Sequence, residues 1–560
     1  MVINNFETVK NKMVSSSQSS RTEDQDIKDS KNQLIEEIQF DLESISSSES
    51  DHVFKDPKLA KYYAGIYEES KYECRHLFDP ELTWTEKEEK IITRKNDWNV
   101  TFWSLIMFTA LNLDRGNIGQ ALSDNMLDDL HLTTNDYNIG QTIFYLCFLA
   151  AELPSQLVSK KIGSDIWVPI QMVLWSVISM SQAALKNKAG FYITRALLGA
   201  VQGGFICDVC LWLSYFYTSK ELPFRLGIFY IANPMTTVWS SLLALGFLQI
   251  KSSSIQEGWR WLFLLEGLIT LIVGLISFFK MPASVAQTKS WYNKKGWYTE
   301  REEKILVNKV LRDDPSKGDL HNRKAVSLKE LVKGALDYDL LFIYLCRFLL
   351  DIGSNPVSNY LQLVLRSMGY STTATNALTI PYNVIMVITM LLTTYYSEVL
   401  KTRALMLATI PVWIAIHLLI LRYWSQAQIN KWGTWVLLTF LLGHAPSWPL
   451  SISWCSANSN SVRSRAISAA VVNMFSQAGG IVAMNIYRKD DAPLYKRGNT
   501  QLIIIAFATL AMILITRQWF IFRNNQRDKK WNSLTKEQQL DYVENTTDKG
   551  NKRLDFRFVY

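Results

Sequence analysis

Residues 108–122 read FTALNLDRGNIGQAL, an apolar run that Asp114 and Arg115 interrupt with a carboxylate and a guanidinium. The run belongs to a block that is long enough to cross a bilayer, since a span needs roughly 20 mostly apolar residues. About twelve such blocks occur, which predicts an all-α membrane protein of twelve spans. The blocks begin near Trp98, Asn138, Trp167, Phe191, Leu226, Trp261, Leu340, Ala377, Leu405, Trp435, Ala466 and Leu502.

The polar stretches between these blocks predict two halves. Six spans fall within 97–280, a hydrophilic connector covers 281–339, and six more spans fall within 340–522. Polar tails cover 1–96 and 523–560. The first tail is Ser-rich and lacks the apolar core of a cleaved signal peptide, so we expect it to be mostly disordered, apart from a short helix around NQLIEEIQF.

Positive charge gathers in the stretches that would lie on one side of the membrane, such as Lys160 and Lys161, the connector and the tail after Arg523. The first loop on the other side has Asp124 and three further Asp residues but no Lys, whereas the loop at 488–497 departs from the pattern with four basic residues. The asymmetry places both termini and the connector in the cytoplasm. It also explains the net charge of +8 without a nucleic-acid partner.

The cysteines and histidines predict neither a metal site nor a disulfide framework. None of the six cysteines falls in an expected outer loop. Cys207 and Cys210 form a CxxC spacing inside an apolar block, but no second pair or nearby His accompanies them, so we interpret them as packing residues. The chain has no nucleophile elbow or phosphate loop, and we expect neither enzymatic activity nor a cofactor.

The charges of the first and fourth spans bear most directly on function. Asp114 lies about sixteen residues into the first span, and Arg195 lies at a similar depth near the start of the fourth. Gln202 follows Arg195 by two helical turns and therefore shares its face. Arg115 and Arg195 could bind an anionic substrate, while Asp114 could carry a proton. The alternative is a structural salt bridge between the two spans.

Five further side chains inside the apolar blocks are candidates, because charges within a membrane usually face a cavity or a partner. Glu152 and Asp208, in the cytoplasmic halves of the second and fourth spans, are candidates for proton coupling. Arg347 and Asp351 form an i,i+4 pair that can neutralise itself on one helix face. His444 ranks lower, since a lone intramembrane His is more often a hydrogen-bonded packing residue than a proton relay.

Several segments together resemble a known family, the fungal allantoate-permease group of the anion:cation symporters within the major facilitator superfamily. The segments run in order through both halves, from roughly residue 90 to 525. In the first half they are LDRGNIGQAL, ELPSQ (152–156), TRALLGAVQGGF (194–205), YTSKELPFRLGIF (217–229) and GWRWLFLLEGL (258–268). In the second half they are MGYSTTATNALTIPY (368–382), WCSANSNSVRSRA (454–466) and RKDDAPLYKRGN (488–499).

The resemblance implies uptake of a small anion with a coupled proton across the plasma membrane, through a site between the halves. Arg115 and Arg195 match arginines of the family, of which the first contacts the substrate, and Asp114 matches a proton site of bacterial relatives. Asn117, in the same LDRGN segment, completes the expected substrate contacts. Gln202 departs from the family, which often has a Glu there that links protonation to release. Since an amide cannot carry a proton, more of the coupling would fall on Asp114.

The leading hypothesis is therefore a transporter that imports a small anion by proton symport and alternating access. Two arginines without a carboxylate at position 202 favour a strongly acidic or doubly charged substrate. We thus favour a sulfur-containing anion over an organic acid, a vitamin acid or an allantoate-like compound. The alternative is a non-transporting nutrient receptor of the same fold, which the long Ser-rich tail motivates. We expect a monomer, with the anion, protons and the lipid bilayer as its partners.

Overall fold

The computed structural model describes residues 52–560 apart from 71, 219–220, 254, 290–292, 319–331, 333, 335, 428, 460–461 and 547–549. All regular elements in these residues are helical, and they contain no strand. The predicted helix around NQLIEEIQF lies outside the described residues.

Each half contains six spanning units, some of which consist of two helices. The units of the N-terminal half are α5 (Phe102–Ser123), α7 (Thr134–Ile162), α8 (Ser164–Ser181), α9 (Lys188–Gln202) with α10 (Phe205–Ser214), α11 (Leu222–Phe247) and α12 (Gly258–Lys280). Those of the C-terminal half are α15 (Leu341–Ser367), α16 (Thr372–Leu378) with α17 (Ile380–Val399), α18 (Arg403–Tyr423), α19 (Lys431–Leu442) with α20 (Trp448–Ala457), α21 (Val462–Met484) and α22 (Lys496–Asn532). The twelve-span all-α prediction is confirmed.

Nine of these units are long and apolar enough to cross a membrane, counted over the described residues. The other three are α5, α15 and the α19–α20 pair. α5 contains Asp114 and Arg115, and α15 contains Arg347 and Asp351, which lower the mean hydropathy of both helices. The tenth unit is interrupted between its two short helices. The spans that are least apolar are thus the ones that carry several of the candidate site residues.

Two glycines break the fourth span. α9 ends at Gln202, and Gly204 has a φ of +85°, a left-handed conformation that favours glycine. A Cβ atom on Gly203 would lie 2.9 Å from the carbonyl oxygen of Phe148 on α7. The tenth span, which holds the corresponding place in the second half, is broken between α19 and α20. Interrupted spans at corresponding places in two repeats are typical of a binding site between the repeats.

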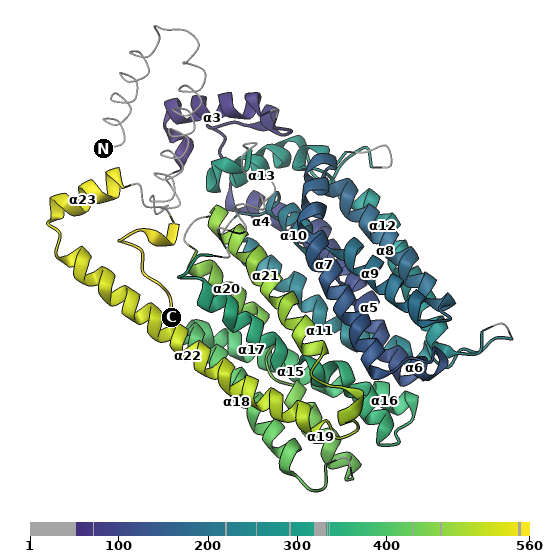
Figure 1. Cartoon of the computed structure of the whole chain (residues 1–560). Coiled ribbons are helices and arrows are strands. Elements are labelled where there is room, and N and C mark those ends of the chain that lie inside the picture. Colours follow the sequence, from purple (N-terminus) through teal and green to yellow (C-terminus); the bar gives the residue numbers. More distant parts are fainter. Residues whose placement is uncertain are drawn as a thin grey trace, which may run out of the picture.

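The bundle has two distinct ends (Figure 1). α13 (Glu300–Asp313) lies at what we call the tail end, and α6 (Met126–Asp129), α16 and α19 lie toward the far end. Hydrogen bonds join the two halves near the far end: Asn376 donates to Ser123 at 3.0 Å, and the hydroxyls of Ser241 and Thr379 lie 2.9 Å apart. These contacts hold the halves together on that side.

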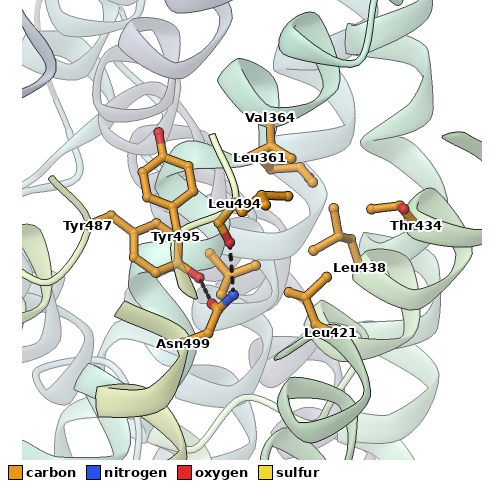
Figure 2. A pocket seen from close by; sticks show the side chains of 10 residues that line it. Leu361, Val364, Leu421, Thr434, Leu438, Tyr487, Leu494, Tyr495 and Asn499 are labelled. Atoms are coloured by element: carbon orange, nitrogen blue, oxygen red, sulfur yellow. Dashed lines mark hydrogen bonds between the residues drawn. The ribbon is translucent and has the colours of Figure 1, made fainter. Parts of the chain in front are cut away.

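A cluster of aromatic rings adds to this closure (Figure 2). Tyr487 stacks on Tyr495 with ring centroids 4.4 Å apart and donates a hydrogen bond to Asn499. Tyr360 on α15 packs against both tyrosine rings. Asn138 of the N-terminal half donates to the carbonyl of Tyr487 at 2.7 Å and accepts from the Tyr360 hydroxyl. The RKDDAPLYKRGN segment therefore helps to close the far end.

The described part of the N-terminal tail is largely helical, so the prediction of a mostly disordered tail is wrong for these residues. It contains α3 (Pro57–Glu69) and α4 (Glu86–Asn96). The Tyr67 hydroxyl donates to the carbonyl of Pro315 at 2.8 Å, and Asn308 donates to the carbonyl of Leu77 at 2.9 Å. Buried apolar side chains of the tail and of α13 belong to one hydrophobic cluster. The tail thus folds against the connector.

The C-terminal tail also differs from the expectation of a polar tail that begins at 523. α22 continues to Asn532, α23 spans Lys536–Asn545, and the last residues return to the bundle. The amide of Asn524 donates to the carbonyl of Phe558 and accepts from its backbone N–H, both at 2.8 Å. Asn458 makes the same two contacts to Val559, at 3.0 and 2.8 Å. Two asparagines therefore fix two consecutive residues of the returning segment.

We expect Phe558→Ala to lower the apparent melting temperature of the purified protein in detergent. Phe558 is buried and stacks on Phe520 at 4.8 Å, and truncation of a buried Phe typically costs about 3 to 5 kcal/mol. Tyr560→Ala is the matched control, because Tyr560 lies two residues away but is exposed. Equal melting shifts for the two variants would show that the segment does not stabilise the bundle.

Candidate functional site

Arg115 lies on α5 beside the break in the fourth span. Its Nε donates to the Oε1 atom of Gln202 at 3.0 Å. Its guanidinium carbon lies 4.8 Å from the ring centroid of Phe148 and 5.7 Å from that of Phe144, both on α7. Its buried Nη2 atom has no hydrogen-bond partner among the described residues. A guanidinium that packs against two aromatic rings and keeps an unused donor is suited to bind an anionic group.

Asp114, one residue earlier, is buried in the interior of the N-terminal half. Ser179 on α8 donates a hydrogen bond to its Oδ1 atom at 2.7 Å, while Oδ2 has no partner in the part of the chain that the structure describes. Arg195 on α9 is also buried, interacts electrostatically with Asp114, and donates a hydrogen bond to Gln182. The similar depth expected for Asp114 and Arg195 agrees with this arrangement.

The two guanidinium groups have different neighbours. Arg115 contacts Gln202 and the rings of α7, whereas Arg195 contacts Gln182 and lies 5.9 Å from the ring centroid of Phe191. Arg195 and Gln202 do share the buried face of α9, as their spacing predicts. Within the part of the chain that the structure describes, no carboxylate lies within 4.0 Å of either guanidinium, so a direct salt bridge between the first and fourth spans is not formed.

Glu152 and Asp208 lie in different surroundings. Glu152 on α7 accepts a hydrogen bond from Asn473 of α21 at 2.8 Å, which connects the two halves. Cys207 donates to the same oxygen at 3.5 Å, and the Glu152 carboxylate interacts electrostatically with Arg115. Asp208 is buried on α10 and faces Ser159. Glu152 is therefore linked to the surroundings of Arg115, whereas the described residues provide no such link for Asp208.

Arg347 and Asp351 form the predicted i,i+4 ion pair, with a nitrogen–oxygen distance of 3.0 Å. Arg347 also donates to the hydroxyls of Ser447 and Ser476, at 2.5 and 3.0 Å. His444 lies in the break of the tenth span, and its ring nitrogens contact Ser354 and a backbone carbonyl at 2.8 Å. The charge of Arg347 is neutralised locally, and His444 is hydrogen-bonded as a packing histidine would be.

Asn117 lies on the same helix as Asp114, three residues later. It is completely buried, and neither its amide nitrogen nor its amide oxygen has a hydrogen-bond partner among the residues described. Buried amides are nearly always paired with protein, water or ligand. Asn117 therefore has spare hydrogen-bonding capacity within the first span.

The family model for the Major Facilitator Superfamily matches residues 104–484, about two thirds of the chain. The chain belongs to the Major Facilitator Superfamily. It is 43% identical to the uncharacterized transporter YIL166C of Saccharomyces cerevisiae over 521 residues, which cover 93% of this chain and 96% of that one. It is 26% identical to the major facilitator-type transporter hxnP of Emericella nidulans, over 79% of this chain and 88% of that one.

Solved structures of other transporters share this fold. The partially occluded inward-open xylose transporter XylE of E. coli aligns with a TM-score of 0.55 at 14% identity, over 73% of this chain and 96% of that one. A bacterial homologue of the human lysosomal transporter Spinster, in an inward-facing conformation, aligns with a TM-score of 0.53, over 77% and 96%. At this level of identity the likeness concerns the fold alone.

The structure of the transporter also points to residues that the sequence did not single out. Tyr145 on α7 interacts electrostatically with Arg115 and with Asp351 of the other half. Its ring lies 3.1 Å from the place where a Cβ on Gly480 of α21 would be. Glu266 is a completely buried carboxylate on α12. Glu266 could have been singled out from the sequence, because it is a carboxylate in the apolar GWRWLFLLEGL segment. No local pattern distinguished Tyr145.

A polar hollow of about 340 Å³ lies at the far end, away from these residues. The ends of α5 and α11 and the short helix α16 line it, and none of the predicted site residues does. Its lining is Asp124, Ala244, Leu245, Leu248, Gln249, Lys251, Thr372, Thr373 and Asn376.

We expect Gly199→Ala to lower the thermal stability and the surface abundance of the transporter. A Cβ at this position of α9 would lie 2.3 Å from the carbonyl oxygen of Phe144, so α7 and α9 would have to separate beside Arg115. Gly227→Ala on α11 is the control, because no described atom lies within 4 Å of the place where its Cβ would be, and alanine favours a helix by about 1 kcal/mol. Unchanged stability and abundance of the Gly199 variant would contradict close packing of α7 and α9.

Proposed function

We propose that this transporter imports a small anion by proton symport and that Arg115 is its principal substrate contact. The proposal rests on the surroundings of this guanidinium. Among the described residues, its buried Nη2 atom has no hydrogen-bond partner, and no carboxylate lies within 4.0 Å of it. Burial of a cation without a counter-ion is costly, and an anionic substrate would remove that cost.

The surroundings of Arg115 support a site between the halves. Gln202 holds the guanidinium from the break in the fourth span, and Tyr145 and Glu152 connect its neighbourhood to the C-terminal half. Gln202 and Asn117 supply amide groups for a substrate that has hydrogen-bond acceptors. We infer a singly charged, strongly acidic group such as a sulfonate as the preferred substrate class, over carboxylates of the allantoate or vitamin type.

We assign the proton to carboxyl groups near this site. Asp114 and Glu152 each have one buried oxygen without a partner in the described part of the chain, and an anion bound at Arg115 would favour the protonated form of the nearby Glu152. Asp208 is a weaker candidate, because it faces Ser159 and not the surroundings of Arg115. We propose the plasma membrane as the location, with the tail end in the cytoplasm, as the charge asymmetry indicates.

Arg115→Ala should abolish uptake of labelled sulfonate, sulfate and carboxylate anions by cells that lack their own carriers for them, at unchanged surface abundance. Arg488→Ala is the control, since Arg488 is an exposed arginine at the far end. Uptake by the unmodified transporter should fall when a protonophore collapses the proton gradient. Uptake that is unaffected by the protonophore would refute symport, and full uptake by the Arg115 variant would refute its role as the substrate contact.

Gln202→Glu should reduce uptake more strongly in neutral than in acidic medium. The new carboxylate would lie near the Nε atom of Arg115, where it would pair with the guanidinium and compete with the substrate anion. Acid would protonate the carboxylate and free the arginine. The apparent KM at two pH values measures this effect, with Gln202→Ala as the comparison that removes the amide without adding charge. A KM that is equally raised at both pH values would contradict competition by charge.

A further inference from the structure

Glu266 and Asp114 belong to one buried polar cluster in the N-terminal half. Glu266 on α12 is 0% exposed and Asp114 on α5 is 1% exposed, and the two carboxylates interact electrostatically. Ser240 on α11 donates to one oxygen of Glu266 at 3.5 Å, and Ser179 on α8 donates to one oxygen of Asp114 at 2.7 Å. Arg195 on α9 completes the cluster as its cation. We call these five residues the carboxyl cluster.

The helices that carry the cluster approach one another closely. A Cβ on Gly267 would lie 3.0 Å from the backbone nitrogen of Met180, so α12 packs against α8 with no room for a side chain. Thr270, one turn after Glu266 on the same helix, faces Asp114. The Ser240 hydroxyl lies 4.0 Å from the place where a Cβ on Gly116 would be. Small residues thus bring the two carboxylates into one enclosed space.

Two oxygen atoms in this space lack hydrogen-bond partners among the described residues. They are Oδ2 of Asp114 and Oε2 of Glu266, both buried, and the Nε atom of Arg195 is buried and unpartnered as well. An ionised carboxylate only accepts hydrogen bonds, whereas a protonated one also donates. A proton on either carboxyl group would therefore add a hydrogen-bond donor to a space that contains two unpartnered acceptor oxygens.

We infer that Asp114 and Glu266 hold one shared proton, which makes Glu266 the second carboxyl group of the transporter's proton site. The charges lead to the same result: two ionised carboxylates and one guanidinium carry a net charge of −1, and one proton brings the cluster to neutrality. A net charge is costly in a buried site, and two like charges at close range do not both ionise readily. This inference rests on the proposed proton coupling and adds a residue to it.

The elements packed around Glu266 present few other ionisable groups. Within the described residues, α5 contributes Asp114 and α9 contributes Arg195, which also interacts electrostatically with Tyr137 on α7. The groups facing the pair from α8 and α11 are the hydroxyls of Ser179 and Ser240 and the indole of Trp175, none of which titrates near neutral pH. The proton count of the cluster is therefore set by the two carboxyl groups.

The test compares Glu266→Gln with Glu257→Gln, the same substitution at the partly exposed start of α12. In cells, Glu266→Gln should lose the stimulation of anion uptake by acidic medium and the effect of a protonophore, while exchange of labelled for unlabelled anion persists. Glu257→Gln should keep the unmodified behaviour. Acid stimulation that survives in Glu266→Gln, at normal surface abundance, would overturn the inference, as would a requirement for Na⁺ in place of acid.

Infrared spectroscopy of the purified transporter tests the shared proton without transport. A component of the carbonyl band of protonated carboxyl groups should be present at neutral pH and should be lost in Glu266→Gln and in Asp114→Asn, but not in Glu257→Gln. A band that is unchanged in both variants would overturn the inference even if uptake is proton-coupled. A band that is lost in both, together with failure of every anion to be transported, would refute the proposed function and leave the proton pair standing.

Discussion

A guanidinium group inside the hydrocarbon layer needs polar partners, and the break in the fourth span supplies the partner of Arg115. The left-handed conformation of Gly204 ends α9 at Gln202, whose amide meets the guanidinium at 3.0 Å. The neighbouring Gly203 lets α9 approach α7, the helix whose rings of Phe144 and Phe148 pack against the same cation. One local interruption thus brings together the amide, the aromatic rings and the charge.

The C-terminal half repeats this arrangement with a different balance of charge. Arg347 lies on the seventh span, which corresponds to the first, and donates to Ser447 at the break of the tenth span, which corresponds to the fourth. Its own helix neutralises it through Asp351 one turn later. In α5 the carboxylate of Asp114 precedes Arg115 by only one residue, so the two side chains leave the helix on different sides. This difference leaves Arg115, unlike Arg347, without a carboxylate within 4.0 Å among the described residues.

The sequence predicted the twelve spans because long apolar blocks have few alternatives, and it predicted the Arg347–Asp351 pair because i,i+4 geometry is local. It also predicted the shared face of Arg195 and Gln202. It could not predict which neighbouring helix that face meets, so the separate surroundings of Arg115 and Arg195 emerged only from the packing. The folded parts of both tails were missed for a related reason, since Tyr67 and Phe558 find their partners more than 30 residues away in the chain.

The adjacency of Asp114 and Arg115 on α5 suggests why proton and anion would move together. Under the proposed function with a singly charged substrate, the empty transporter would have one excess positive charge at Arg115 and one excess negative charge in the carboxyl cluster. Binding of both the anion and the proton neutralises Arg115 and the carboxyl cluster. Binding of only one of them leaves a net charge on groups that α5 carries or contacts. The count takes Glu152, which interacts electrostatically with Arg115, as protonated throughout. Because net charge is costly in a low-dielectric interior, the half-loaded states would be the hardest to rearrange, which is the condition that symport requires.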